Sequence, residues 1–137
     1  MKLCDTSVLV DIDRGGIDEK VDALDQEGRH TISAVTVTEL RLGIEYQYEP
    51  ETTAYRDALQ DLDRLIARFN VIPVSRPVTV ATSRILGTLR RNGQMLNDLH
   101  DCYIGGTART EELPVLTANV DHFERMPAVD VVNWETY

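Results

Sequence analysis

The chain has 137 residues, a formal net charge of −9, 42% hydrophobic residues and 27% charged residues. This length favours one domain over residues 1–137, large enough to bury a sheet flanked by helices. No apolar run approaches the roughly 20 residues of a membrane-spanning helix and no secretory signal precedes the first predicted strand, so we expect a cytoplasmic protein without a membrane partner. The negative charge weighs against simple electrostatic adhesion to nucleic acid, which normally leaves a basic surface.

The first half of the chain alternates between strand and helix patterns. A short buried strand begins at Lys2 and has Asp5 as its last residue, and a helix follows at once with Thr6 or Ser7 as its N-cap. Further on, the sequence predicts helices over 17–26, 37–48 and 51–69 and a strand over 30–35. Ser33 or Thr36 can cap the helix that begins at residue 37.

The second half continues the same alternation. Strands are predicted over 71–74, 114–117 and 129–132, helices over 77–91 and 97–109, and one helical turn over 121–124. Gly105, Gly106 and Ala108 indicate that the helix over 97–109 packs closely against a neighbour. Strands that alternate with helices predict an α/β fold of three layers, with a mostly parallel central sheet of about five short strands and helices on both faces.

Four acidic residues lie beside apolar segments, where solvated carboxylates are not expected: Asp5, Glu39, Asp98 and Asp101. Asp5 follows a buried strand, and ligands of open α/β sheets bind outside the carboxyl ends of the strands. Glu39 lies in the first turns of a helix that follows the next strand, so it points toward the same edge of the sheet. The alternatives are that Asp5 only caps its helix and that Glu39 only complements a helix dipole.

Asp98 and Asp101 are three residues apart and are therefore predicted to share a helical face. Like charges placed in this way repel, and grouping them with the other acids would raise their pKa values unless a cation compensates. A solvated acidic patch is the alternative, and it explains Asp98 better than Asp101, which opens an apolar run. The four acids together predict a divalent-metal site assembled by folding.

Other chemistries find little support in the sequence. A zinc site made from Cys4, His100, Cys102 and His122 lacks the close paired spacings of structural zinc, so both thiols are interpreted as small buried hydrophobes. The three histidines lie in unrelated contexts, and His122 is interpreted as part of a helical turn rather than a catalyst. No Ser/His/Asp or Cys/His arrangement for a nucleophile is apparent.

Four segments of the chain together resemble a known family, the PIN-domain ribonucleases, and most closely the VapC-type toxins of toxin–antitoxin pairs. They are Leu3-Cys4-Asp5-Thr6-Ser7, Thr38-Glu39-Leu40-Arg41-Leu42-Gly43-Ile44, Asp101-Cys102-Tyr103-Ile104-Gly105-Gly106-Thr107-Ala108 and Leu116-Thr117-Ala118-Asn119-Val120-Asp121-His122-Phe123. Each segment alone is weak, but all of them occur in order at separations like those of the family, across nearly the whole chain.

This resemblance implies a PIN-like fold and an endoribonuclease that depends on Mg²⁺ or Mn²⁺ and hydrolyses RNA phosphodiester bonds with metal-activated water. Asp5, Glu39 and Asp101 would ligate the metal, and Asp98 would be an auxiliary acid. Carboxylate oxygens suit a hard cation that keeps several waters, so the donor chemistry agrees with the resemblance.

A second set of residues surrounds these predicted ligands. Thr6 and Thr117 are expected to orient ligands or waters. Family members often place a further acid where this chain has Asn119, which weighs against a second metal ion, although the amide can hold a metal-bound water. Asp121 can substitute for the missing acid if its loop curls inward.

The expected partners are RNA, a small antitoxin protein and a second copy of the chain. Arg41, Arg90 and Arg91 are candidates for phosphate contacts, since arginine suits bidentate binding of phosphate. The resemblance implies the antitoxin and the homodimer, for which Tyr46, Tyr48 and the apolar stripe from Tyr55 to Phe69 offer surfaces. A basic antitoxin side chain inserted among the acids would displace the metal.

Other classes of function fit these residues less well. A haloacid-dehalogenase-type phosphatase needs a second aspartate at the position of Ser7, and a receiver domain needs adjacent N-terminal acids and a lysine near its last strands. A catalytically weak PIN-like module that only binds a protein partner, or another metal-dependent phosphohydrolase, stays an alternative. RNA cleavage that requires both a divalent metal and Asp5 distinguishes the ribonuclease from these alternatives.

Overall fold

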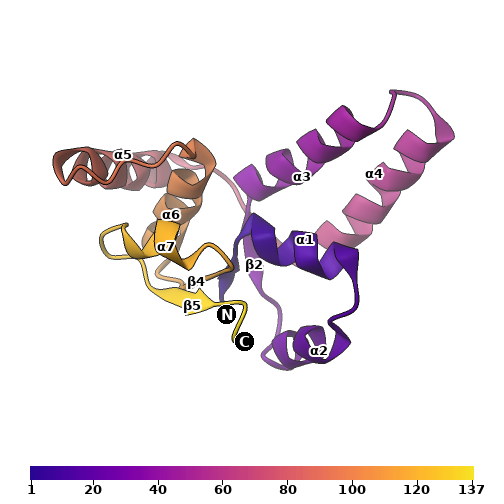
Figure 1. Ribbon diagram of the computed structural model, residues 1–137, viewed down its shortest axis with the longest axis horizontal. Helices are drawn as coiled ribbons and strands as arrows, with labels where there is room; N and C mark the ends of the chain where they lie inside the picture. Colours follow the sequence, from indigo (N-terminus) through magenta and orange to yellow (C-terminus); the bar gives the residue numbers. More distant parts are fainter.

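The computed structural model describes residues 1–137 and is built on one five-stranded parallel sheet in the order β3-β2-β1-β4-β5 (Figure 1). Each of the four strand pairs is parallel. The strands are β1 (Leu3–Cys4), β2 (Thr31–Ser33), β3 (Asn70–Ile72), β4 (Val115–Thr117) and β5 (Val131–Asn133). The predicted α/β fold with a parallel sheet of about five short strands is confirmed.

Seven helices connect and cover the strands. They are α1 (Thr6–Arg14), α2 (Asp18–Gln26), α3 (Ala34–Gln47), α4 (Thr53–Ile66), α5 (Arg76–Arg91), α6 (Leu99–Glu111) and α7 (Val120–Glu124). Every predicted helix is present with shifted ends. The predicted strand over 30–35 stops at Ser33 because its hydroxyl caps α3, accepting a hydrogen bond from the Val35 amide over 3.0 Å.

Two predictions about the acids are wrong in detail. Asp5 is not the last residue of β1 but the N-cap residue of α1, where Thr6 or Ser7 was expected. Asp98 lies outside α6 as its N-cap rather than on a helical face, and its carboxylate accepts a hydrogen bond from the Asp101 amide over 3.2 Å. In both places the helix begins one or two residues away from the predicted point, because short acidic side chains favour the extended backbone at a helix start.

The alternation of side chains along the central strands divides the apolar interior into two cores. Leu3 and Val115 pack against α5, α6 and α7, in a core that includes Ile85 and Phe123. The next residues along the same strands, Cys4 and Leu116, point to the opposite face and pack beneath α1, α2 and the end of α4. Because successive strand residues face opposite sides, a strand of two residues is enough to anchor both layers of helices.

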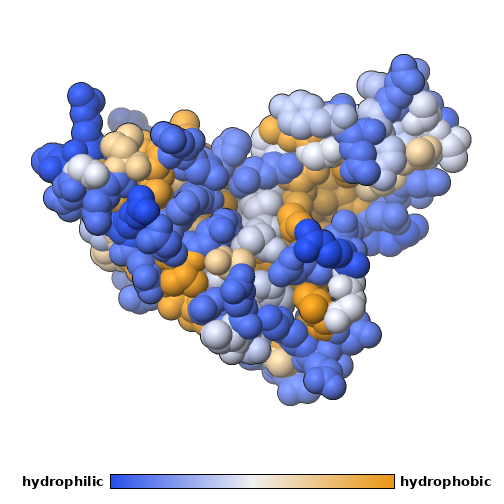
Figure 2. Space-filling view, viewed as in Figure 1, coloured by the Kyte–Doolittle hydropathy of each residue, from blue (hydrophilic) through white to orange (hydrophobic).

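Helices α3 and α4 form an arm that projects away from the sheet (Figure 1). They are joined by the turn around Pro50, and α1 lies beside the end of the arm that is nearest the sheet (Figure 1). An apolar area lies between the two helices on the molecular surface (Figure 2). The arm therefore presents apolar side chains that the sheet does not cover.

The order of the strands brings separate segments together at one edge of the sheet. The chain moves from β1 outward to β2 and β3, and then returns to the other side of β1 to form β4 and β5. The direction of winding therefore reverses between β1 and β4, where ligands of open parallel sheets bind beyond the carboxyl ends of the strands. Asp5 and Thr117 stand at these two strand ends. No helix is both long and apolar enough to cross a bilayer.

Two glycines let α6 pack closely against its neighbours, as the small residues of α6 predicted: Gly106 faces α5 and Gly105 faces Met126. A Cβ atom on Gly106 would lie 2.1 Å from Thr82 Oγ1 and 3.0 Å from the Thr82 backbone nitrogen. A Cβ atom on Gly105 would instead meet the sulfur of Met126 at 2.3 Å. The first contact includes rigid backbone, whereas the second is with a flexible side chain that can move.

We therefore predict that Gly106→Ala lowers the free energy of unfolding by about 1–3 kcal/mol and that Gly105→Ala lowers it by less. Gly43→Ala is the matched control, because no atom lies within 4 Å of its Cβ position inside α3 and alanine favours a helix. Urea unfolding of the three variants measures the difference. Equal destabilisation by the substitutions at 105 and 106 would contradict the role of the α5 backbone.

Candidate active site

A cavity of about 370 Å³ opens at the edge of the sheet beyond β1 and β4. Its lining contains no lysine or arginine and includes six acidic residues: Asp5, Asp11, Glu39, Asp98, Asp101 and Glu135. Four of these are the acids that the sequence singles out, and the fold brings them together from α1, α3 and α6. Their common cavity is a region of negative potential with no positive side chain in its wall.

Asp5 is buried and held by two hydroxyl groups. Thr117 Oγ1 donates a hydrogen bond to Asp5 Oδ2 over 2.8 Å, and Ser7 Oγ donates to the same oxygen over 2.9 Å. The Asp5 carboxylate accepts no capping hydrogen bond from the backbone of α1, so the alternative that this residue only caps the helix does not describe its contacts. Thr117 therefore has the predicted place beside a candidate ligand, and Ser7 is an additional support.

Glu39 reaches the cavity from the second turn of α3. The hydroxyl of Thr6 donates to Glu39 Oε1 over 2.8 Å and lies 3.1 Å from Thr36 Oγ1. Burial raises the pKa of Glu39, and the charges of Asp5 and Asp98 raise it further, while the Thr6 hydrogen bond and the nearby His100 oppose this change. Thr6 thus supports the charged form of Glu39 from the predicted position.

Asp101 lies in the first turn of α6 and is only 3% exposed. Burial raises its pKa to about 6, and the charges of Asp5 and Asp98 add to this effect. His122 opposes the shift, because its Nδ1 lies 2.6 Å from Asp101 Oδ2. A carboxylate that is buried among other carboxylates favours a proton or a cation at this place.

Two histidines border the acids. His122 bonds to Asp101, and His100 Nδ1 lies 3.9 Å from both Glu39 Oε2 and Asp98 Oδ1. The interpretation that the histidines lie in unrelated contexts is therefore wrong for these two, because α7 folds back against the start of α6. The acid at 101 and the histidine at 122 are far apart in sequence, and no local pattern links them. His30 alone is remote, bonded to Leu24 O and the Lys2 amide.

The other predicted site residues are divided between the cavity and the outer surface. Asn119 lines the cavity as the N-cap of α7, and its backbone N–H donates a hydrogen bond to Thr117 Oγ1 over 2.8 Å. Asp121 does not line it: its side chain is 75% exposed and pairs with Arg125, so the loop does not curl inward. None of Arg41, Arg90 and Arg91 lines the acidic cavity.

The donor set fits a hard divalent cation better than zinc. The polar groups of the cavity are carboxylate, hydroxyl and amide oxygens, which suit Mg²⁺ or Mn²⁺. No three His, Cys, Asp or Glu side chains are grouped closely enough to enclose an ion by themselves. An ion held by Asp5, Glu39 and Asp101 would therefore keep water in part of its coordination shell, as Mg²⁺ usually does.

The two cysteines take no part in this site. Cys4 belongs to one apolar core and Cys102 to the other, so they lie on opposite faces of the sheet. Burial raises the pKa of Cys4 to about 12 and that of Cys102 to about 11, which keeps both thiols protonated. Their interpretation as small buried hydrophobes is confirmed, and a shared zinc site is excluded by their positions.

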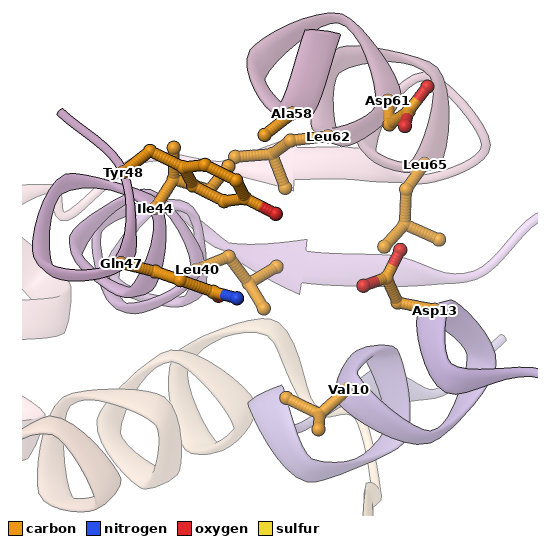
Figure 3. A pocket seen from close by; sticks show the side chains of 10 residues that line it. All are labelled: Val10, Asp13, Leu40, Ile44, Gln47, Tyr48, Ala58, Asp61, Leu62 and Leu65. Atoms are coloured by element: carbon orange, nitrogen blue, oxygen red, sulfur yellow. The ribbon is translucent and has the colours of Figure 1, made fainter. Parts of the chain in front are cut away.

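A second, apolar cavity of about 200 Å³ adjoins the acidic one, between α1, α3 and α4 (Figure 3). We call it the arm groove. Its apolar lining comes from Val10, Leu40, Ile44, Ala58, Leu62 and Leu65, and Asp13 and Asp61 stand at its wall. Val10 also lines the acidic cavity, so the two cavities share one side chain.

Part of the predicted partner surface belongs to the arm groove. Tyr48 lines it, as does Leu62 of the stripe from Tyr55 to Phe69, and Leu65 lines it without having been predicted. Phe69 is buried in the core, and Tyr46 is 83% exposed on the outside of the arm.

Comparison with known proteins relates this arrangement to one family. The family model of the PIN domain matches residues 2–129. Ribonuclease VapC4 of Mycobacterium tuberculosis is 30% identical over 130 residues, which are 95% of this chain and 94% of the relative. The tRNA(fMet)-specific endonuclease VapC of Salmonella typhimurium is 30% identical over 106 residues, covering 77% of this chain and 76% of the relative.

A solved structure has the same fold over nearly its whole length. The chain is similar to one chain of the DNA-bound VapBC crystal structure from Salmonella typhimurium, with a TM-score of 0.85 and 25% sequence identity. The similarity covers 98% of this chain and 99% of that chain.

The raised pKa of Asp101 predicts how stability depends on pH in metal-free buffer. Because the folded state holds this proton more tightly than the unfolded chain, the stabilisation is fully present below about pH 4 and is lost as the pH rises through about 6. We expect the free energy of unfolding to fall by roughly 2 kcal/mol over this range.

Asp101→Asn should remove this loss of stability, because the amide does not titrate, whereas Asp57→Asn on the exposed face of α4 should retain it. Chemical unfolding in EDTA at several pH values between 4 and 7 measures the difference between the variants. The same pH profile for wild type and Asp101→Asn would show that Asp101 is not the titrating group.

Proposed function

The chain belongs to the PIN-domain family and, within it, to the VapC ribonucleases, and from this membership we propose that it is the toxin of a toxin–antitoxin pair. It cleaves RNA as an endoribonuclease that requires Mg²⁺ or Mn²⁺. The observation that carries the proposal is the cavity in which Asp5, Glu39 and Asp101 meet without any lysine or arginine.

The side chains around the acids have separate tasks in this proposal. Thr117 and Ser7 hold the Asp5 carboxylate in one orientation, and Thr6 does the same for Glu39. A divalent cation bound there supplies the positive charge that activates a water molecule and stabilises the charge developing on the scissile phosphate. Asp98 adds negative charge that strengthens cation binding, since it raises the pKa of both Glu39 and Asp101.

Both relatives are VapC enzymes, one named a ribonuclease and the other a tRNA(fMet)-specific endonuclease. The solved neighbour is a VapBC complex, which supports an antitoxin as the partner of this chain. The arm groove offers an apolar binding surface for a segment of that antitoxin. We also propose that the chain forms a homodimer. Two unpaired, buried cysteines agree with a reducing cytoplasm.

We predict that Asp5→Asn lowers metal-dependent RNA cleavage by about 100-fold or more, because it removes a metal ligand whose charge no neighbour replaces. Thr117→Val should lower the affinity for Mg²⁺ by about 10- to 100-fold while leaving the carboxylate in place. Asp57→Asn, on the exposed face of α4, is the control of equal charge change. Cleavage of RNA by purified protein is measured in Mg²⁺ and in EDTA.

Full cleavage by a folded Asp5→Asn variant would contradict the proposed site. A wild-type protein that binds an antitoxin but never cleaves RNA in Mg²⁺ or Mn²⁺ would instead favour the protein-binding module. Circular dichroism and the unfolding midpoint verify the fold of each variant.

The shared side chain Val10 leads to a prediction about inhibition. A segment seated in the arm groove ends beside the acids, so a basic side chain at its end can enter the acidic cavity and take the place of the metal. Inhibition by the antitoxin is then competitive with Mg²⁺, and titrating metal into the complex should partly restore cleavage.

Metal affinity of the complex, measured by Mn²⁺ binding, provides the check. Antitoxin binding should weaken it by about 10-fold or more, which corresponds to a modest coupling between two ligands for one site. An inhibited complex that keeps the full metal affinity of the free protein would indicate that the antitoxin blocks RNA sterically.

A further inference from the structure

The basic residues of this acidic chain are unevenly distributed. Between Asp63 and Asp98 the sequence contains six arginines and no aspartate or glutamate, although the chain has 23 acidic residues in total. Helix α5 carries four of these arginines: Arg76, Arg84, Arg90 and Arg91. A helix that keeps unneutralised positive charge in a protein of net charge −9 indicates an anionic partner at its surface.

A cavity of about 470 Å³ gathers part of this charge, and we call it the arginine cavity. It lies between α5, the last turns of α6 and the turn after α7, and its arginines are Arg84, Arg91 and Arg109. Ser83 and Thr88 add hydroxyl groups, and no carboxylate lines it. Its composition is thus the opposite of the acidic cavity.

The three arginines of this cavity have no ion-pair partner, which is also true of Lys20, Arg29, Arg56, Arg76 and Arg90. Six basic side chains elsewhere pair with a carboxylate: Lys2, Arg14, Arg41, Arg64, Arg68 and Arg125. The pairing of Arg41 with Glu45 also makes it a weaker candidate for phosphate than the sequence predicted. Arg84 and Arg109 donate no side-chain hydrogen bond and Arg91 donates one, to Thr88, so most of their donors are available for a ligand.

One glycine of α5 shapes the cavity. The guanidinium of Arg91 lies back along the helix over Gly87, so that a Cβ atom on Gly87 would be 3.2 Å from Arg91 Nη1. Nη2 of the same guanidinium donates a hydrogen bond to Thr88 Oγ1 over 3.2 Å. Gly87 has ordinary helical backbone geometry. Its lack of a side chain therefore provides space for the Arg91 guanidinium rather than an unusual backbone conformation.

We propose that the arginine cavity binds a phosphate of the RNA backbone away from the scissile bond, an inference that rests on the ribonuclease function proposed above. Guanidinium groups with hydroxyls beside them suit a phosphate, which accepts paired hydrogen bonds from arginine. Arg109 follows Asp101 by eight residues on α6, which is about 12 Å along the helix axis. That separation corresponds to roughly three or four stacked nucleotides.

The placement explains how an acidic protein can hold an acidic polymer. The metal site faces the phosphate that is cut, and the arginine cavity holds the strand a few nucleotides away, where no metal is needed. Arg91 is one of the arginines that the sequence predicted to contact phosphate. Arg84 and Arg109 were not predicted, because only the fold brings them to the same cavity.

The double variant Arg84→Gln/Arg109→Gln tests the proposal. Binding of a short single-stranded RNA in EDTA, measured by fluorescence anisotropy at several salt concentrations, should weaken roughly 5-fold at about 0.1 M salt. The slope of log affinity against log salt should become shallower by about 0.7, because each phosphate contact contributes about 0.7 and the cavity holds one phosphate. At saturating RNA in Mg²⁺ the cleavage rate should stay that of the wild type.

Arg56→Gln/Arg76→Gln is the matched control, since both side chains are exposed, neither lines the arginine cavity and the change in net charge is the same. Gly87→Ala tests the geometry without changing charge: its methyl group displaces the Arg91 guanidinium and should weaken RNA binding, while alanine stabilises the helix. Light scattering checks that all variants keep the oligomeric state of the wild type.

Unchanged affinity and salt slope in Arg84→Gln/Arg109→Gln would overturn the inference, and so would an equal loss in the control pair, which would reflect net charge alone. If the wild type cleaves RNA and the variant binds RNA as tightly as the wild type, the arginine cavity is rejected as a phosphate site but the ribonuclease function is not. Binding of inorganic phosphate by a wild type that binds no RNA would reject both. Loss of antitoxin binding with normal RNA binding would assign the cavity to an acidic protein segment instead.

Discussion

The mutual repulsion of buried carboxylates is the constraint on which the rest of this structure depends. Six acids line one cavity without a lysine or arginine, and burial together with neighbouring charge raises the pKa of Glu39 and Asp101. The Thr6 hydroxyl holds Glu39 in place, the Thr117 hydroxyl holds Asp5, and the imidazole of His122 holds Asp101. Such an arrangement lowers the stability of the fold unless a cation neutralises the negative charge. The binding site at this edge of the sheet therefore destabilises the metal-free protein.

The parallel sheet supplies the rigidity that this repulsion requires. Leu3 and Cys4 anchor β1 in opposite cores, so the strand cannot shift without opening both. Asp5 follows immediately, and its position is therefore fixed by the packing of the two preceding residues. The other acids lie at or near the starts of α3 and α6, and both helices begin at the same edge of the sheet. Close contact between α5 and α6 through Gly106 fixes the position of α6.

Sequence patterns predicted the element order, the parallel sheet and the meeting of Asp5, Glu39, Asp98 and Asp101, because strand ends and helix starts carry local signals. They favoured Thr6 or Ser7 over Asp5 as the N-cap, since a one-residue shift of a helix start changes no hydrophobic pattern. The contact between His122 and Asp101, and the cavity that unites Arg84, Arg91 and Arg109, also lay outside their reach. Both depend on how α7 and its following turn pack against α6, which no periodicity encodes.

The two cavities of opposite charge lie toward opposite ends of α6, whose first turn carries Asp101 and whose last turns carry Arg109. The central claim is that the acidic end binds a divalent cation through Asp5, Glu39 and Asp101. A crystal of the protein soaked in Mn²⁺ and measured for anomalous scattering tests this claim most directly. The account predicts a manganese peak within coordination distance of Asp5 and Asp101, with water completing its shell. A crystal that binds manganese elsewhere, or leaves these carboxylates without an ion at saturating Mn²⁺, would contradict it.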